Sequence, residues 1–485
     1  MSLLEKATGN FWIDNGLVAL HRMLGGADLP EDVNTVVQQI VGRIYVETGK
    51  TAKYWDKAIG ELLTYNKRNW KEPTGLFISV VDAVPKVEIE GKQYYTRPPE
   101  PKIQIQPKGK NQRCDFCGAL GATVDAKLYL FPFVVDPGKF GNFYSSARRG
   151  LKMCPRCAVA GFAAFESWLW RRQGNTYHFF LFHTDLDRLD ALQNSLVLPL
   201  QQEAEGRSGN FNAPFFGEYP FENLFGLLLC LFAIIRQRES EGHLDPILAE
   251  LTGAQAVVGS PIVLYTISGA YGGQSFSMRA LNQFDRFQPM YRLYCRWLER
   301  LGTENPHRTL EQVFRQFQHR RQQSVETLWR EQICRAILQQ ADPMPVVESF
   351  LYDVSVETRR ALSYGTLEVF QIYSQEVMKM EEKLLNILSG FGYHLGSQAA
   401  QKSEMGLLYA LRNAKNLDQF LEVLNQIQFT LEMTINPELL RVEPNERIAG
   451  APWNRVKTLL AIHAMNAYLR TKYPTSTATS EGGEP

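Results

Sequence analysis

Four of the seven cysteines in this 485-residue chain lie in two short pairs, Cys114-x-x-Cys117 and Cys154-x-x-Cys157. This spacing lets two thiolates from one tight turn bind the same zinc ion, and two such turns complete a tetrahedral shell of four sulfurs. The 36 residues between the pairs exceed the roughly 15–20 of common zinc ribbons, so we expect an insertion with a hairpin through 127–135. Four thiolates leave no open position for water, so we expect one structural zinc ion per chain.

The expected cellular compartment supports metal binding over disulfides. No run of about 18 apolar residues is present, and the richest stretch, 225–235, has the length of a core helix. The first ten residues lack the basic-then-apolar pattern of a signal peptide. We therefore expect a cytoplasmic protein with no membrane partner. Paired cysteines in a reducing compartment favour a metal site, with buried or redox-active thiols as the alternative.

The sequence predicts an α+β fold: a mixed α/β N-terminal domain with an inserted four-cysteine zinc module, followed by an all-α C-terminal helical bundle. The expected parts are an N-terminal α+β part (1–101), a zinc-binding basic module (102–172), the remainder of the N-terminal domain with Arg-rich helices (173–343), the C-terminal helical bundle (344–473) and a disordered tail (474–485).

Local patterns predict individual elements. Apolar periodicity and caps predict helices over 14–24, 29–47 and 54–70, and a continuous packed seam from Phe370 to Ile387. Short strands are expected within 75–84, 86–90, 92–97 and 102–106, and a buried strand over 176–185 leads into a helix. His178 and His183 on that strand are interpreted as core residues. Cys230, Cys295 and Cys334 lie among apolar residues and receive the same interpretation.

Although the whole chain has a net charge of +1, the zinc module is strongly basic. From Lys102 to Arg172 there are 12 Lys and Arg against 4 acids, a local net charge of +8. Aromatic residues lie among them, and this mixture suits a phosphate backbone and unstacked bases. Lys108, Lys110, Arg148 and Arg149 are the candidate phosphate contacts, and the alternative is a solvated basic face.

A second basic stretch runs from Arg279 to Arg335, with eleven arginines, no lysine and six acids. Arginine favours bidentate phosphate contacts, so Arg320 and Arg321 join the candidates. Ion pairs along helix surfaces are the alternative.

The opening "TGNFWIDNGLVAL" (8–20) resembles the Thr-Gly-Asn-x-φ-x-Asp-x-Gly start of the large subunit of type I CRISPR interference complexes (Cascade; the Cas-eight family). Phe11-Trp12 stand where that family more usually has Pro-Phe. The paired cysteines and the helical C-terminal part are similar to the layout of the family.

This resemblance implies a non-enzymatic, nucleic-acid-binding subunit that recognises the short PAM in duplex DNA and promotes R-loop formation. The partners it implies are crRNA, target double-stranded DNA, the backbone, crRNA-end and small subunits, and a helicase-nuclease that the chain helps to recruit. In such complexes crRNA reads the target by base pairing, so the protein needs only PAM contacts and basic channels. Met344 lies where an internal start producing a separate small subunit is expected.

Three segments are candidate PAM readers. The first is 268–283, where glycines precede Gln274, Ser275, Ser277, Arg279 and Asn282, whose polar groups suit base edges. Its alternative is a strand-to-helix connection with helix-capping polar groups. The second is 106–112, with Lys108, Lys110, Asn111 and Gln112. The third is the opening Thr-Gly-Asn, with Asn10.

Two other function classes stay open. The chain has no His-Glu-x-x-His, no Gly-x-Ser-x-Gly and no phosphate-loop motif. A metal-dependent nuclease whose site assembles from distant residues is one alternative. A zinc-stabilised scaffold without a nucleic-acid role is the other.

Overall fold

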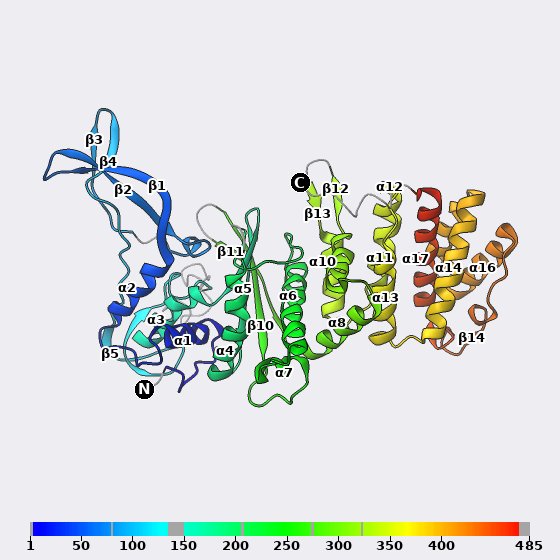
Figure 1. Cartoon of the computed structure of the whole chain (residues 1–485), viewed down its shortest axis with the longest axis horizontal. Coiled ribbons are helices and arrows are strands. Elements are labelled where there is room, and N and C mark those ends of the chain that lie inside the picture. The colour runs from blue at the N-terminus through cyan, green and yellow to red at the C-terminus, as the bar shows by residue number, and fades with distance from the viewer. Residues whose placement is uncertain are drawn as a thin grey trace. The chain divides into compact units, whose positions relative to one another are not determined.

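The computed structural model describes residues 3–78, 81–133, 150–204, 208–272, 276–321 and 324–474 (Figure 1). The chain divides into two units. Unit 1 comprises residues 1–212 and 238–285, and unit 2 comprises residues 213–237 and 286–485. The domain layout expected from the sequence is not confirmed by this division, and most of the expected tail, 475–485, lies outside the described residues.

Unit 1 combines helices with three sheets. Its elements are α1 (Phe11–Met23), α2 (Val33–Ile44), β1 (Tyr45–Asp56), β2 (Glu61–Trp70), η1 (Thr74–Leu76), β3 (Lys86–Ile89), β4 (Lys92–Tyr95), β5 (Lys108–Arg113), β6 (Leu120–Asp125), β7 (Lys152–Met153), α3 (Pro155–Ala163), η4 (Ala164–Glu166), β8 (Leu169–Gln173), β9 (Thr176–His183), α4 (Leu186–Leu192), η5 (Gln193–Val197), α5 (Leu198–Gln202), α7 (Pro246–Thr252), β10 (Val263–Tyr271) and β11 (Phe276–Phe284). The sheet orders are β2-β1-β4-β3, β11-β10-β9-β8 and β5-β6-β7.

The core of unit 1 lies around α1, which packs on α3, β9 and α4. Trp12 is fully buried there, and its ring meets Phe165 and Trp168 edge-on. Strand β9 is buried over nearly its whole length and leads into α4, as the sequence predicted. It pairs antiparallel with both β8 and β10, so it lies inside its sheet.

Helix α1 begins earlier than expected. Its N-cap is Asn10, whose side-chain oxygen accepts from the backbone amides of Trp12 (3.0 Å) and Ile13 (3.1 Å). Asp14, the expected cap, lies one turn inside the helix and is fully buried. The earlier cap takes precedence because Asn10 satisfies the free amides of the first turn.

The helix expected over 54–70 is wrong: β1 and β2 form an antiparallel hairpin there. The side chain of Asp56 accepts from the Ala58 amide at 2.8 Å, and Gly60 adopts a left-handed φ of 72°. These two residues close a turn in the middle of the expected helix. Aromatic residues and threonine on both sides suit strands, so turn chemistry outweighs the apolar periodicity.

Two of the expected short strands are also wrong. The described part of 75–84 contains η1 and a single bridge at Val81, and 102–106 belongs to no sheet. Ile103 and Ile105 are nevertheless buried, and the Ile105 amide donates to the side chain of Asn34 at 2.8 Å. The side chain of Asn34 on α2 thus accepts the hydrogen bond that a partner strand would otherwise accept. The hairpin at 86–97 is confirmed as β3 and β4.

Unit 2 is mainly helical. Its elements are α6 (Pro220–Ser240), α8 (Phe287–Leu301), α9 (Pro306–Arg315), β12 (His319–Arg321), β13 (Ser324–Glu326), α10 (Leu328–Leu338), α11 (Met344–Phe350), η6 (Leu351–Ser355), α12 (Val356–Thr358), α13 (Tyr364–Glu376), α14 (Glu382–Lys402), α15 (Met405–Asn413), α16 (Leu417–Leu431), η7 (Pro437–Leu439), β14 (Val442–Glu443), β15 (Arg447–Ile448), β16 (Ala451–Pro452) and α17 (Trp453–Lys472). The part of α6 that belongs to unit 2 ends at Gln237.

Helix α6 is a core helix. Among the described residues it is the one helix long and apolar enough to cross a membrane, and 61% of its most apolar window is buried inside the protein. At its start Glu222 is fully buried and pairs with Arg330 of α10 at 2.7 Å. The Thr327 hydroxyl also donates to Glu222 at 2.7 Å. This buried, hydrogen-bonded pair fixes α10 against α6.

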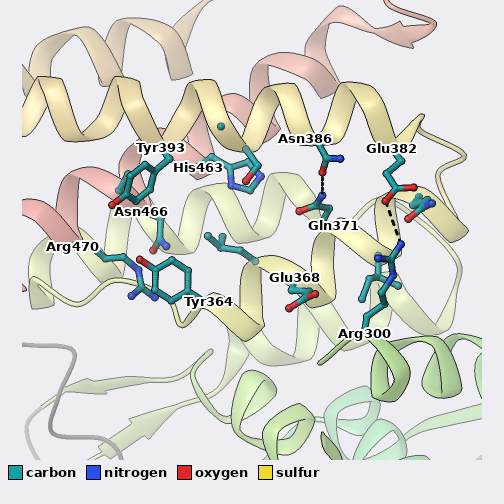
Figure 2. A pocket seen from close by; sticks show the side chains of 16 residues that line it. Arg300, Tyr364, Glu368, Gln371, Glu382, Asn386, Tyr393, His463, Asn466 and Arg470 are labelled. Atoms are coloured by element: carbon teal, nitrogen blue, oxygen red, sulfur yellow. Dashed lines mark hydrogen bonds and ion pairs between the residues drawn. The ribbon is translucent and has the colours of Figure 1, made fainter. Parts of the chain in front are cut away.

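The C-terminal part is helical, as expected, with two differences. The seam from Phe370 to Ile387 is interrupted, because α13 ends at Glu376 and Lys379 adopts a left-handed φ of 57° before α14 begins. A small sheet, β14-β15-β16, interrupts the expected all-α bundle. Helices α14 and α17 run side by side, and a Cβ on Gly396 would lie 1.9 Å from the carbonyl oxygen of Ala464. A cavity lies between α13, α14 and α17 (Figure 2).

Candidate metal centre and the surfaces beside it

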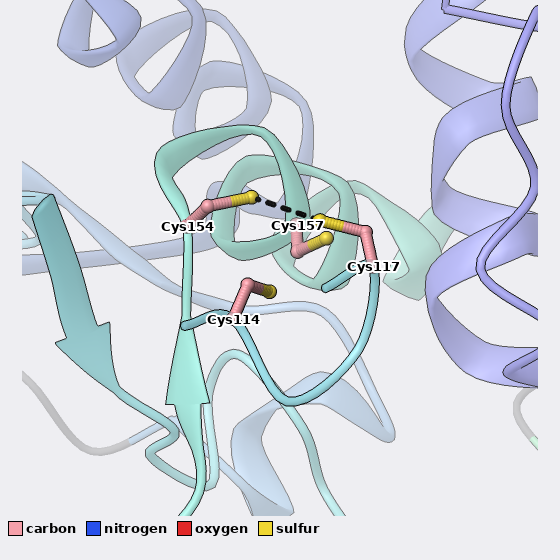
Figure 3. Close-up of side chains that lie close together, drawn as sticks. All are labelled: Cys114, Cys117, Cys154 and Cys157. Atoms are coloured by element: carbon pink, nitrogen blue, oxygen red, sulfur yellow. Dashed lines mark hydrogen bonds between the residues drawn. The ribbon is translucent and has the colours of Figure 1, made fainter. Parts of the chain in front are cut away.

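The two cysteine pairs converge on one point (Figure 3). The sulfurs of Cys114, Cys117, Cys154 and Cys157 all lie within 4.8 Å of one another, and those of Cys117 and Cys154 are 3.6 Å apart. A tetrahedral zinc ion with Zn–S bonds of about 2.3 Å separates its sulfurs by about 3.8 Å. Four cysteines in this arrangement could hold a metal ion. They form the one group of three or more candidate ligands within the described ranges.

The local sequence explains both turns. Gly118 adopts a left-handed φ of 75° and its amide donates to the carbonyl of Cys114 at 3.0 Å, which closes the first turn between β5 and β6. Cys154 is the N-cap of α3, with Pro155 in the first helical position. Cys157 therefore lies in the first turn of a helix, where the helix dipole favours a thiolate.

Backbone and side-chain hydrogen bonds join the two turns. The Asp115 amide donates to the Lys152 carbonyl at 2.9 Å, and the Lys152 amide donates to the Asp115 carboxylate at 2.7 Å. The β5-β6-β7 sheet also joins the two turns, because β5 ends just before Cys114 and β7 ends just before Cys154. The second cysteine pair is thus held in register with the first by groups outside the cluster.

The thiols perturb one another strongly. Hydrogen bonds from Cys154 and Cys157 lower the pKa of Cys114, while the hydrogen bond with Cys114 raises the pKa of Cys154 and of Cys157. Thiols this close cannot all ionise without a compensating charge. A divalent cation supplies that charge, so the donor set and the electrostatics both fit a metal ion.

The opening segment of the chain packs on α3 and on the turn at 127–131, beside this centre. The indole NH of Trp12 donates to the carbonyls of Leu130 (3.0 Å) and Gly161 (2.9 Å). Arg156, in the first turn of α3, donates to the carbonyls of Leu3 and Lys6. The opening motif at 8–20 and the cysteine module therefore pack together within unit 1.

Inside that motif, Asp14 is the central acceptor. It accepts from the Thr8 amide (2.8 Å) and hydroxyl (2.7 Å), from the Gly9 amide (3.0 Å) and from His183 Nε2 (3.1 Å). This role for Asp14 was not predicted from the sequence. The sequence feature that points to it is the Thr8-x5-Asp14 spacing. Asn10, the third candidate PAM reader, uses its side-chain oxygen as a helix cap.

The hairpin expected through 127–135 is not formed in its described part. The amides of Leu130 and Phe131 both donate to the Lys127 carbonyl at 2.8 Å, which makes a turn. Phe133 contacts Phe11 and Trp12, so the aromatic residues pack into the core instead of alternating along a strand. The segment 134–149, which includes the candidates Arg148 and Arg149, lies outside the described residues.

Strand β5 displays the candidates Lys108, Lys110 and Asn111, and all six of its residues are exposed. Its pairing with β6 is irregular between Lys108 and Gln112, so Lys110 and Asn111 lie in a bulge. Bulges redirect side chains away from the regular face of a sheet. The second candidate PAM segment is thus an exposed, irregular strand that leads directly into Cys114.

Other basic residues of the module bind within the chain. Lys152 pairs with Asp125, Arg171 is buried and donates to the Phe211 carbonyl, and Arg172 pairs with Glu72. Arg156 contacts the N-terminal segment as described above. The local charge of +8 therefore overstates the charge available at the surface.

The first candidate PAM segment, 268–283, belongs to a hairpin of β10 and β11. It is therefore neither the projecting loop that was expected nor the strand-to-helix connection that was its alternative. Gln274 and Ser275 at its tip lie outside the described residues. Ser268 pairs with Ala280 and Gly269 with Met278, so Arg279 is the extra residue of a bulge. Arg279 and Ser277 are exposed, whereas Asn282 is half-buried.

Several arginines of the arginine-rich stretch bond to groups within the chain. Arg300 pairs with Glu382, Arg315 donates to the Pro214 carbonyl, and Arg330 is buried with Glu222. Arg320 lies exposed on β12, and the side chain of Arg321 lies outside what the structure describes. Of the other core assignments, His178 bonds to Ser268 at 2.7 Å and Cys334 is buried, while Cys230 and Cys295 are half-buried.

No protein-family model matches the chain, and no curated protein matches it either.

Proposed function

We propose that this chain is a zinc-containing, nucleic-acid-binding large subunit of a crRNA-guided type I CRISPR surveillance complex, as its opening motif implies. The observation that carries the nucleic-acid role is β5, a fully exposed strand with Lys108 and Lys110 that is fixed to the metal centre at Cys114. A pair of exposed lysines on one strand suits contact with a phosphate backbone without sequence preference.

The metal of this proposal is zinc. Four thiolates with no further donor form the closed shell that zinc takes in structural sites. The ion would be held by Cys114, Cys117, Cys154 and Cys157, and it would fix β5 and α3 relative to each other. Nothing in this role requires the ion to contact substrate.

The proposed PAM reader is the β10–β11 hairpin. A two-stranded ribbon fits the major groove, and an arginine can bind the O6 and N7 of guanine with two hydrogen bonds. Arg279 is exposed at a bulge of β11, the edge strand of its sheet. Lys110 and Asn111 are likewise exposed at a bulge of an edge strand, β5. Strand β5 is therefore the second candidate PAM reader.

The partners of the proposal are crRNA, target DNA, the remaining Cascade subunits and a helicase-nuclease, in the cytoplasm. The protein recognises the PAM, the crRNA reads the target by pairing, and the opened duplex becomes an R-loop. No catalytic step is assigned to the chain itself.

The experiment compares two DNA substrates in the assembled crRNA complex: a PAM-bearing duplex and the same target already melted open. We expect Gln274→Ala with Asn282→Ala, or Arg279→Ala alone, to weaken binding of the duplex about tenfold and to spare the melted target. Equal losses on both substrates, or no loss on either, would exclude this hairpin as the reader. Lys110→Ala with Asn111→Ala tests the rival strand in the same way.

A zinc-stabilised scaffold without a nucleic-acid role is the second candidate. Arg171 and Arg172 favour it, because both bind groups within the chain. It predicts that the zinc-loaded chain does not bind DNA, even at low salt.

A further inference from the structure

The cavity between the helices of unit 2 has the composition of a ligand site. It measures about 550 Å³ and is lined from α8, α13, α14 and α17. That volume falls within the range of small-molecule sites in proteins. Neither the metal centre nor the basic strand contributes to it, since both belong to unit 1.

One end of the cavity is aromatic. Tyr364 and Tyr393 are 62% and 54% exposed. They are the only exposed tyrosines in the described part of the chain, and both line this cavity. Figure 2 shows them at the same end, beside Arg470 and Asn466. The Arg470 guanidinium lies 3.7 Å from the ring centroid of Tyr364, whereas Tyr393 has no such ring contact among the described residues.

Arg470 supplies positive charge at that end. It donates to the Leu362 carbonyl, and its Nε atom is buried without a hydrogen-bond partner in the described structure. No described carboxylate pairs with it, in contrast to Arg300 at the opposite end, which pairs with Glu382 at 3.3 Å. The positive charge beside the tyrosines is therefore not neutralised by a described carboxylate, and its guanidinium lies over the Tyr364 ring.

The middle of the cavity is neutral and polar. Gln371 donates to Asn386 at 3.0 Å from one helix to the next (Figure 2). His463 of α17 is only 7% exposed, lines the cavity and makes no hydrogen bond to any described residue. Burial lowers the pKa of His463 to about 4. Its neutral ring at pH 7 carries one donor and one acceptor that a ligand in the cavity can use.

We propose that this cavity binds a nucleotide, with the base stacked on Tyr393, the base edge facing His463 and the phosphate on Arg470. Stacking on an aromatic side chain together with an arginine–phosphate contact is how proteins hold single nucleotide units. Two sources have this chemistry: a free nucleotide, or one nucleotide of a single strand.

The test is a titration of the full-length protein with AMP, adenosine, ribose 5-phosphate and a short oligodeoxyadenylate. Tyr393→Ala should weaken the binding of AMP or of the oligonucleotide about tenfold, and Tyr393→Phe should restore it. Arg470→Gln should abolish the preference for AMP over adenosine. Phe429→Ala is the matched control, because Phe429 of α16 is 73% exposed and does not line the cavity.

The ligand that responds identifies the source. AMP binding that Tyr393→Ala weakens supports a free nucleotide, and oligonucleotide binding that the same change weakens, without AMP binding, supports a strand. The proposal is overturned if Tyr393→Ala changes neither, or if ribose 5-phosphate binds as tightly as AMP. Because Lys108 and Lys110 lie in unit 1, Lys108→Glu with Lys110→Glu leaves AMP binding unchanged, which separates this site from the proposed DNA surface.

Discussion

Gly16 of α1 lies directly against Ala160 of α3: a Cβ atom on Gly16 would stand 1.8 Å from the Ala160 carbonyl oxygen. The two helix backbones are therefore in contact, and no larger residue fits at this crossing. Gly16 is the last residue of the motif at 8–16, and α3 carries Cys157. The motif thus has a structural role, which is to seat the cysteine module on α1.

Replacing Gly16 with alanine should destabilise unit 1 by about 3 kcal/mol or more, because the added methyl group collides with backbone rather than with a movable side chain. The urea midpoint followed by tryptophan fluorescence measures this change, since Trp12 is buried beside the crossing. Gly42→Ala on α2 is the matched control, because no atom lies within 4 Å of a Cβ there. Equal midpoints for the two variants would contradict the close approach.

Replacing Cys154 with serine should remove the bound metal and unfold the module locally, because metal binding and folding are coupled in such sites. Metal analysis of freshly purified protein should find one zinc ion per wild-type chain and none in the variant. Cys295→Ser makes the same chemical change outside the cluster and should retain the ion. A wild-type protein without zinc would refute the metal assignment.

Glu331 should make a contribution to the stability of unit 2 that falls as the pH rises from about 4.5 to 7. Burial raises the pKa of Glu331 from 4.5 to about 7 in the folded protein. The folded state then binds more protons than the unfolded state within that window, so the contribution of Glu331 is fully present below pH 4.5 and is lost as pH approaches 7. Glu331 is expected to contribute about −1.4 kcal/mol per pH unit to the slope inside the window.

Glu331→Gln should remove that contribution and make the measured slope less negative by about 1.4 kcal/mol per pH unit, since glutamine keeps an acceptor for the Glu222 amide but does not titrate. Urea unfolding at several pH values between 4.5 and 7 provides the measurement. Glu326→Gln, a half-buried acid on β13, serves as the comparison. An unchanged slope in Glu331→Gln would assign the pH dependence to other groups, among them Glu348, whose pKa is also raised by burial.

The sequence was sufficient to predict features set by local chemistry. The cysteine spacing predicted the cluster, and the continuous apolar run at 176–185 predicted a buried strand that leads into a helix. The strand and each Cys-x-x-Cys turn depend on residues close together in the chain, for which spacing is a direct guide to geometry. The joining of the two turns followed from the four ligands that a structural zinc ion requires. The helical C-terminal part followed from apolar periodicity for the same reason.

Features set by polar side chains and by groupings of helices, which the apolar pattern does not reveal, were missed. The β1–β2 hairpin was taken for a helix because its apolar residues recur at helical spacing, whereas Asp56 and Gly60 form the turn. Asp14 was taken for a helix cap, whereas its carboxylate accepts from Thr8, Gly9 and His183. The cavity in unit 2 had no sequence signal, since its tyrosines, histidine and arginine come from three separate helices.

The most direct test of the nucleic-acid role is the salt dependence of DNA binding by the zinc-loaded, full-length protein. Binding of a labelled duplex is measured at several salt concentrations for wild type, for Lys108→Glu with Lys110→Glu, and for Lys379→Glu with Lys415→Glu, two exposed lysines of unit 2. We expect the first variant to bind more weakly and its logarithmic salt slope to fall by about one for each lysine. The unit 2 variant should match wild type. Identical affinities and slopes for all three proteins would contradict the assignment of β5 as a phosphate-binding surface.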